Sequence, residues 1–532
     1  MSLGEAKKIT AEFKGTAYAP PPRTVADIEA MLDENRLTNW QRVEADRRLA
    51  DSQPPAGASR RELAQFHRDR AKAAIFVGRF IQARQDLLKT LEILHQAGIR
   101  ETRSGSSLNE TEIHADLAHA EQFSGRLGQW RVHTAVRVRF AASRTNDQSP
   151  SPYAVAATAA AAATGWLAEA EAYIESADQR VSNIYNWGSD FAAIVRSQVP
   201  ASTGRVLDYQ GRHWEAEPLL RKAVQQVRQD RAGGKNPETR GGRYNLRDAW
   251  AIVEIEFLNW LSTNLIRQGR LAEAELTARD SLKVSVARWG RYSPYTARAL
   301  NHLNWAVAAQ NRLDDSRRLT EATLEILDKT GVPAAAWERA RLGAHIAGIE
   351  MLGSNWQATR DILHDLRELL RKADPTAFRA RFRGDPNYLL ALIKTDDAPT
   401  ARAILEPQSK RLGQLLSAQH YQTAEMGALL AMARAAVGET DAALAGFRAA
   451  VPILLRHSRA VSGDDIQQRF RRNHILESYL DLLADRNLAA EAFPIADVLK
   501  GSTVQAAVAA SAAQVAARDP QLADLVRREQ DA

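Results

Sequence analysis

The chain has 532 residues, enough for roughly three to five globular domains. In a repeat array, however, the length does not predict the number of domains. A hydrophobic share of 45% and a charged share of 25% exclude disordered, collagen-like and low-complexity classes. The absence of cysteine excludes disulfides, thiolate metal sites and a cysteine nucleophile, and a net charge of +7 predicts solubility more than a nucleic-acid partner.

The beginning of the chain has no apolar block typical of a signal peptide. Thr24–Asp27 resembles a capping box at a helix start, and Pro54–Gly57 interrupts the chain again. We therefore expect an N-terminal extension with capping helices over residues 1–60. No stretch of about 18 to 20 apolar residues occurs, which predicts no membrane span. The sequence is compatible with a cytoplasmic protein and with a protein that is exported and loses its signal peptide.

Beyond residue 60 the pattern is helical and repetitive. Apolar residues recur every three or four positions, and glycine and proline are sparse, at 29 and 19 residues. Gly211, Gly269 and Gly438 are each followed by alanine at an offset of five and by small or apolar residues at nine and twelve. Weaker copies of this pattern begin at Gly78, Gly128, Gly165, Asn311, Gly353, Asp396 and Asp485.

The spacing has a physical reason in a two-helix unit. A glycine ends the first helix in a left-handed conformation, and the alanine five residues later lets the second helix approach closely. The segments resemble tetratricopeptide repeats, and the 42-residue step from Gly269 to Asn311 resembles the long variant of kinesin light chains. The resemblance implies an all-α, right-handed solenoid of about ten helical hairpins.

The array predicts a domain organisation along the chain. N-terminal units cover 61–230, a basic glycine-rich loop covers 231–247, and C-terminal units cover 248–500. Residues 501–532 are expected to form terminal helices that lead toward a further domain. In the unit that ends at Gly269, the pattern predicts buried leucines and one small residue, at Leu258, Leu261, Leu265 and Ser262.

Stacked hairpins form a concave surface lined by their first helices, which binds extended peptides or partner domains. Counting back from the turn residues places six side chains in this groove: Glu256, Asn259, Thr263, Arg298, Asn301 and Trp305. Asparagine amides can pair with any peptide backbone, and Trp305 offers an apolar anchor. The alternative is that the asparagines only bond neighbouring helices.

Sequence motifs for catalysis are missing. The twelve histidines form no His-x-x-x-His pattern, and no phosphate-binding loop of the Gly-x-x-x-x-Gly-Lys type occurs. We therefore expect no enzyme activity, no metal and no cofactor.

Two clusters of arginine and phenylalanine, at 378–383 and 469–472, leave open a nucleic-acid-binding scaffold. The simpler interpretation is a helix with phenylalanine inside and arginines extending outward. A third possibility is a structural module that dimerises through its terminal helices, because the alanine-rich segment 504–517 makes a poor polar cap.

Both ends of the chain resemble one family. The segments 472–484, 490–496, 501–507 and 517–531 look like the end of the helical region in bacterial proteins whose repeats precede a caspase-like CHAT domain. The segments 22–28 and 54–58 resemble the start of the same proteins. This resemblance implies a non-catalytic protein- or peptide-binding scaffold that regulates or positions a CHAT domain following residue 532.

Overall fold

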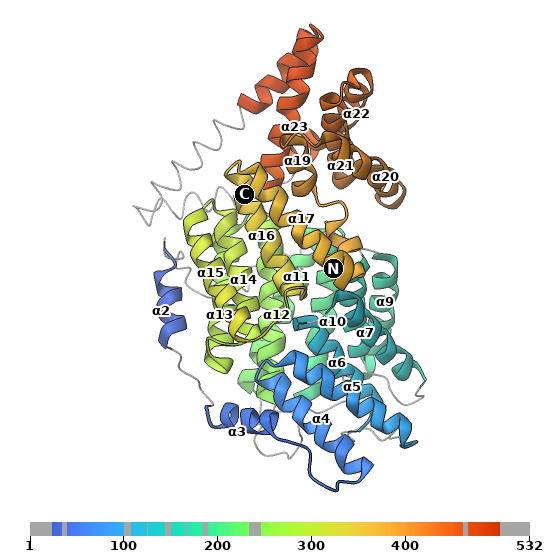
Figure 1. Ribbon diagram of the computed structural model, residues 1–532, viewed down its shortest axis with the longest axis vertical. Coiled ribbons are helices and arrows are strands. Elements are labelled where there is room, and N and C mark those ends of the chain that lie inside the picture. Colours follow the sequence, from blue (N-terminus) through green and yellow to red (C-terminus); the bar gives the residue numbers. More distant parts are fainter. Residues whose placement is uncertain are drawn as a thin grey trace. The chain divides into compact units, whose positions relative to one another are not determined.

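The computed structural model describes residues 24–34, 40–99, 108–124, 126–143, 150–164, 167–184, 190–233, 246–460 and 466–500 (Figure 1). Within these residues every regular element is a helix, and no strand occurs. The predicted all-α fold is confirmed. The predicted terminal helices, 501–532, lie outside the described residues, as do residues 234–245 of the predicted basic loop.

The described residues divide into two compact units, one up to Asp385 and one over 386–460 and 467–500. Unit 1 contains the hairpins α4 (Arg60–Phe76) with α5 (Phe80–Gln96), α6 (Glu110–Ser124) with α7 (Leu127–Ala142), α8 (Ser151–Thr164) with α9 (Leu167–Ile184), α10 (Asp190–Tyr209) with α11 (His213–Gly233), α12 (Leu246–Arg267) with α13 (Leu271–Trp289), α14 (Pro294–Ala309) with α15 (Leu313–Lys329), and α16 (Trp337–Leu352) with α17 (Trp356–Ala373). It ends with α18 (Pro375–Ala377) and the π-helical turn η3 (Phe378–Phe382).

Unit 2 contains α19 (Pro386–Lys394) with α20 (Ala398–Leu416), α21 (Tyr421–Ala436) with α22 (Thr440–Ala460), and α23 (Ile466–Asp485) with the helical residues 489–500. The described helices thus pair into ten hairpins, as the sequence predicted. The predicted loop at 231–247 does not separate two units, because one core cluster extends from Ile194 in α10 to Ala306 in α14.

Most hairpins turn at one residue with a positive φ. These residues are Gly78, Gly211, Gly269, Asn311, Ser354, Asp396, Gly438 and Asn487. At Gly269, whose φ is 75°, the next amide, Arg270 N, donates to Leu265 O at 2.9 Å. This is a Schellman turn, which satisfies a carbonyl at the end of the first helix.

Three weak repeat copies need correction. The left-handed residue of the α16–α17 turn is Ser354 and not Gly353, so the side chain packed against the first helix is Thr359. Likewise, the left-handed residue of the last turn is Asn487 and not Asp485. Gly128 lies inside α7, because α6 already ends at Ser124. Helix geometry moves these turns by one to three residues without changing the number of hairpins.

Small residues bring the two helices of a hairpin together. Ser262 in α12 is buried, and its Oγ donates to the carbonyl of Ala274 in α13 at 2.9 Å. Gly204 holds the equivalent position in α10, where a Cβ atom would lie 3.0 Å from the carbonyl oxygen of Ala216. The predicted burial of Leu258, Leu261 and Leu265 is confirmed.

The N-terminal helices occupy two places in unit 1. Helix α3 (Trp40–Asp51) packs against α4. Helix α2 (Ala26–Glu34) instead lies on the outer helices α13 and α15, where Ile28 and Leu32 join their core cluster (Figure 1). Arg279 in α13 forms an ion pair with Asp27 of α2. The extension therefore covers a later hairpin as well as the first.

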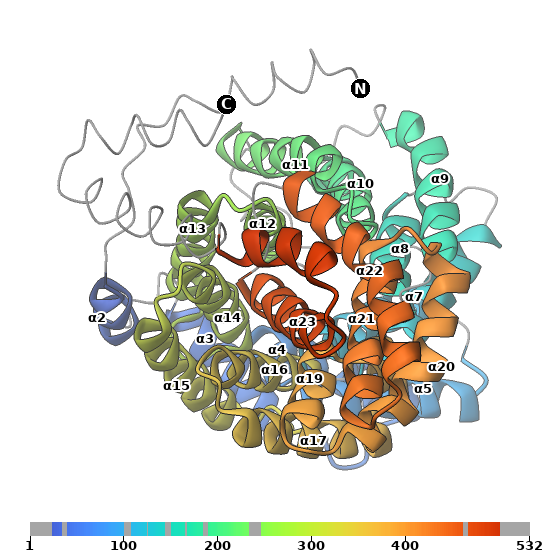
Figure 2. The same cartoon turned by 90° about the horizontal axis from the view of Figure 1, so that it is seen from above.

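Unit 1 closes on itself. Figure 2 shows α11, α13, α15 and α17 on the outside of α12, α14 and α16, following one another around a curve. The early hairpins then meet the late ones: α6 packs against α14 and α16, and α7 packs against α18. The backbone amide of Leu127 in α7 donates to Asp374 Oδ2, just before α18, at 2.5 Å.

Candidate binding site on the inner surface of unit 1

The six residues predicted for the groove divide into two groups. Asn259, Thr263 and Asn301 are buried, with exposed fractions of 1%, 2% and 4%. Asn259 Oδ1 accepts a hydrogen bond from Ser281 Oγ at 2.8 Å, and Thr263 Oγ1 donates to the carbonyl of Asn259 at 2.8 Å. The expectation that these three side chains project into an open groove is wrong, because the wall of helices encloses them.

Glu256, Arg298 and Trp305 lie on the inner face. Arg298 Nη1 donates to Glu256 Oε1 at 3.0 Å, although the two residues are 42 positions apart. Trp305 is partly accessible, and the guanidinium of Arg341 lies 5.2 Å from its ring centroid. The structure therefore leaves Glu256 and Trp305 partly accessible, whereas Arg298 is buried beside Glu256.

Part of that surface is covered by the chain itself, through α6. Gln122 Nε2 in α6 donates to Glu256 Oε1 at 2.6 Å, and Arg298 lies 4.5 Å above the ring of Phe123. His119 Nε2 is 2.6 Å from the Tyr295 hydroxyl, and burial lowers the pKa of His119 to about 4. Burial also raises the pKa of Glu256, which the nearby Arg298 only partly offsets. An extended peptide cannot follow the full length predicted for the groove.

The rest of the inner surface stays accessible and is rich in arginine. The accessible or partly accessible side chains there are Tyr209, Glu256, Arg267, Trp305, Arg341 and Arg381, and the more buried Arg205 and Arg298 lie beside them. We call the arginines 205, 267, 298, 341 and 381 the inner arginines. The side chain of Arg381 is solvent-exposed. Loss of hydration beside the protein is nevertheless the main cause that lowers the pKa of its guanidinium. Water therefore reaches this enclosed surface.

Sequence reasoning missed Arg205, Arg267, Arg341 and Tyr209, whereas Arg381 belongs to the cluster 378–383 that the sequence analysis named. A signal for two of them was present, because Arg341 is 43 residues after Arg298 and Arg205 is 58 residues before Thr263. Relative to the left-handed turn residues of their own hairpins, Arg341 is equivalent to Arg298, and Arg205 is equivalent to the buried Thr263 and to the partly accessible Trp305. Applying the same spacing from the turn residue in one more hairpin would have predicted both arginines.

The pKa of Tyr209 reflects the positive charge of this surface. Burial alone would raise the pKa of its phenol, but Arg205, Arg381, Arg267 and Arg341 together lower it to about 8. Arg205 Nη2 donates to the Tyr209 hydroxyl at 3.2 Å, and Arg381 lies 5.0 Å from the centroid of the ring. The phenolate is therefore stabilised by a positive field.

We expect one of the eleven tyrosines to titrate near pH 8, seen as phenolate absorbance that Tyr209→Phe removes. Because the folded-state pKa lies below the ordinary value of 10, the folded protein loses this proton first. The free energy of unfolding should then rise from about pH 8 to pH 10 relative to the variant, and fall as the pH drops through 8. Identical titrations of the two proteins would contradict the assignment.

The two arginine and phenylalanine clusters differ in the structure. In the first, Phe382 is buried as expected, but Arg381 turns inward to Tyr209 instead of outward. In the second, Arg471 and Arg472 are buried, and Arg471 pairs with Glu425 at 2.9 Å. Two of the three arginines of the second cluster are therefore part of the packing of unit 2, and Arg469 is its one exposed arginine.

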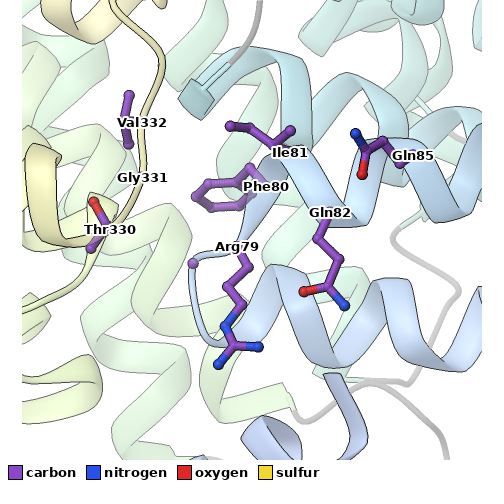
Figure 3. Close-up of a pocket in the computed structure, with 9 residues that line it drawn as sticks. Arg79, Phe80, Ile81, Gln82, Gln85, Thr330, Gly331 and Val332 are labelled. Carbon is purple, nitrogen blue, oxygen red and sulfur yellow. The ribbon is translucent and has the colours of Figure 1, made fainter. Parts of the chain in front are cut away.

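A separate hollow of about 270 Å³ lies between the α4–α5 turn and residues Thr330–Val332 (Figure 3). Arg79 and Gln82 extend to the same side of it. Arg79 is paired with Asp51, and Gln82 Nε2 donates to the carbonyl of Ala50 at 2.5 Å. Because these polar groups already bond within the protein, the hollow is a weaker candidate than the inner surface.

Two classes of site find no support in the part of the chain that the structure describes. No group of three or more histidine, aspartate or glutamate side chains could hold a metal ion there. Among the described helices, none is long and apolar enough to cross a membrane.

Three comparisons with known proteins relate this chain to others only at the level of solved structures, all of them below 25% identity. No protein-family model matches the chain, and no curated protein is detectably similar in sequence. Nearly identical TPR-like repeats from a Podosopora anserina kinesin light chain are 16% identical over 38% of this chain and 96% of theirs, with a TM-score of 0.30. The apo form of RapI is 11% identical over 75% and 99% (TM-score 0.35), and the anaphase-promoting complex hetero-tetramer Cut9–Hcn1 is 10% identical over 82% and 81% (TM-score 0.32). The hairpins themselves define the fold.

Proposed function

We propose that the chain is a non-catalytic scaffold that binds a segment of a partner protein on the inner surface of unit 1. The observation that supports this proposal is the set of inner arginines beside Trp305 and Tyr209, of which Arg267, Arg341 and Arg381 are at least partly accessible. Such a surface combines aromatic and arginine side chains, the residue types that dominate binding energy at protein interfaces. The closing contacts of α6 confine the partner to a short segment.

The test is selection of binding peptides from a random display library, followed by calorimetric titration of the selected peptides. Replacing Arg341, which stacks on Trp305, by alanine should weaken binding at least about tenfold, as expected for a truncated anchor. The matched control is Arg317→Ala, because Arg317 lies on the outer helix α15 and pairs only with the exposed Asp314. Peptides that are insensitive to the first change and sensitive to the second would place the binding surface outside and overturn the proposal.

We further propose, from the resemblance of both ends of the chain to repeat regions that precede CHAT domains, that the scaffold regulates or positions such a domain in a longer protein. Binding of a selected peptide should then change the peptidase turnover of that protein, and Arg341→Ala should remove the change. Turnover that is the same with and without peptide would contradict regulation. Dimerisation through the terminal helices stays a separate proposal, supported by Phe493, which is 78% exposed on the last described helix.

A further inference from the structure

The inner arginines come from five separate elements and converge on one region. Arg205 is in α10, Arg267 in α12, Arg298 in α14, Arg341 in α16 and Arg381 in η3. Arg205 and Arg381 both contact the ring of Tyr209, at 4.4 and 5.0 Å from its centroid. Arg205 also acts electrostatically on His302 and Arg341, so it links the α10 side of the region to the α16 side.

Carboxylates compensate only part of this charge. Asp208 accepts from Arg205 at 2.8 Å and from Arg267 at 2.5 Å. Arg298 is paired with Glu256 at 3.0 Å and with Glu338 at 3.2 Å. Within the described residues, these five guanidinium groups and the three carboxylates of Asp208, Glu256 and Glu338 carry an excess of two positive charges.

The least compensated charges are accessible ones. Arg341 has its nearest carboxylate oxygen, from Glu338, at 3.7 Å, and it also contacts the neutral ring of His302. Arg381 has no carboxylate within 4.0 Å in the described part of the chain. It lies over the ring of Tyr209, with its guanidinium carbon 5.0 Å from the ring centroid, and its side chain is exposed. Partial burial of the neighbouring Arg341 and Arg267 strengthens the attraction of the region for an anion relative to open solvent.

We propose that the inner arginines bind a phosphoryl group carried by the partner segment. This inference rests on the proposed function, because the partner supplies the group. A phosphoryl ester carries a charge of about −1.5 to −2 at neutral pH, which matches the excess of two, whereas one carboxylate supplies only half of it. The planar guanidinium group also matches phosphate oxygens in a bidentate geometry.

The first test uses inorganic phosphate as the probe. Phosphate should raise the thermal midpoint of the protein, and it should raise the pKa of Tyr209 above about 8, because a bound anion disfavours the phenolate. Arg381→Gln should reduce phosphate affinity at least about tenfold. Arg379→Gln is the matched control, because Arg379 lies two residues away on the same short turn and is exposed. Equal losses in both variants, or an unchanged Tyr209 titration, would overturn the proposal.

The second test separates the carriers of the phosphoryl group. A selected peptide that contains serine is titrated with and without phosphate on that serine, beside a 5′-phosphorylated oligonucleotide. Stronger binding of the phosphopeptide, lost in Arg381→Gln, supports the proposal. Equal binding of the two peptides overturns it and leaves the proposed function intact. Preference for the oligonucleotide, with no peptide binding, overturns both in favour of a nucleic-acid scaffold.

Discussion

Replacing Arg68 by leucine should lower the free energy of unfolding of unit 1 by about 3 kcal/mol or more. Arg68 in α4 is fully buried and forms an ion pair with Asp116 in α6, which is 6% exposed. Removing the guanidinium takes a charged partner away from a buried carboxylate, and breaking a buried ion pair by removing one side is costly. Chemical denaturation followed by circular dichroism measures the change.

Two further variants decide whether the cost comes from the unpaired charge. Arg68→Leu combined with Asp116→Leu should recover most of the loss, because apolar side chains can replace a buried ion pair at little cost. The exposed pair of Arg79 and Asp51 lies in the same region, and Arg79→Ala should cost far less than Arg68→Leu because water screens exposed ion pairs. A double variant as unstable as the single one would show that packing volume, and not charge, matters at this position.

The second large effect is expected at Gly78, where the α4–α5 turn touches α14. Its φ is +80°, and a Cβ atom there would lie 2.4 Å from Cδ of Pro294. Gly78→Ala combines left-handed backbone strain of about 1 kcal/mol with a clash of about 1 to 3 kcal/mol. We expect a total loss of about 2 to 4 kcal/mol in the free energy of unfolding, measured by denaturation.

Gly211→Ala is the control for backbone strain, because Gly211 has a φ of +82° and nothing within 4 Å of the added Cβ atom. It should cost only about 1 kcal/mol. Adding Pro294→Ala to Gly78→Ala should recover part of the difference by removing the clash. Equal losses for Gly78→Ala and Gly211→Ala would mean that the turn does not press on α14, and the closed arrangement of unit 1 would be in doubt.

The hairpins could be predicted from the sequence because their signals are local. A turn residue and a small residue five positions later lie within one hairpin, so spacing alone identified Gly269 with Ala274 and Gly438 with Ala443. The closure could not be predicted in this way. It depends on contacts such as Gln122 with Glu256 and Leu127 with Asp374, which join residues more than one hundred positions apart and leave no periodic trace.

The candidate site shows the same division. Glu256, Arg298 and Trp305 are predicted at repeating inward positions, and in the structure Glu256 and Trp305 are partly accessible while Arg298 is buried against Phe123 of α6. Asn259 and Asn301 have the same spacing, but only the packed structure shows that neighbouring helices bury them. Arg381 lies in the turn η3, outside the repeated hairpins, so the repeat spacing does not predict that it faces the inner surface.

The closure of unit 1 also bears on how this protein can evolve. An open array gains a repeat by gene duplication at little cost, because each hairpin contacts only its neighbours. In unit 1, one additional hairpin between α8 and α15 would move Asp374 away from the Leu127 amide and Glu256 or Arg298 away from α6. Hairpin number in unit 1 should therefore be fixed among homologues, whereas length changes should collect in the connecting loops.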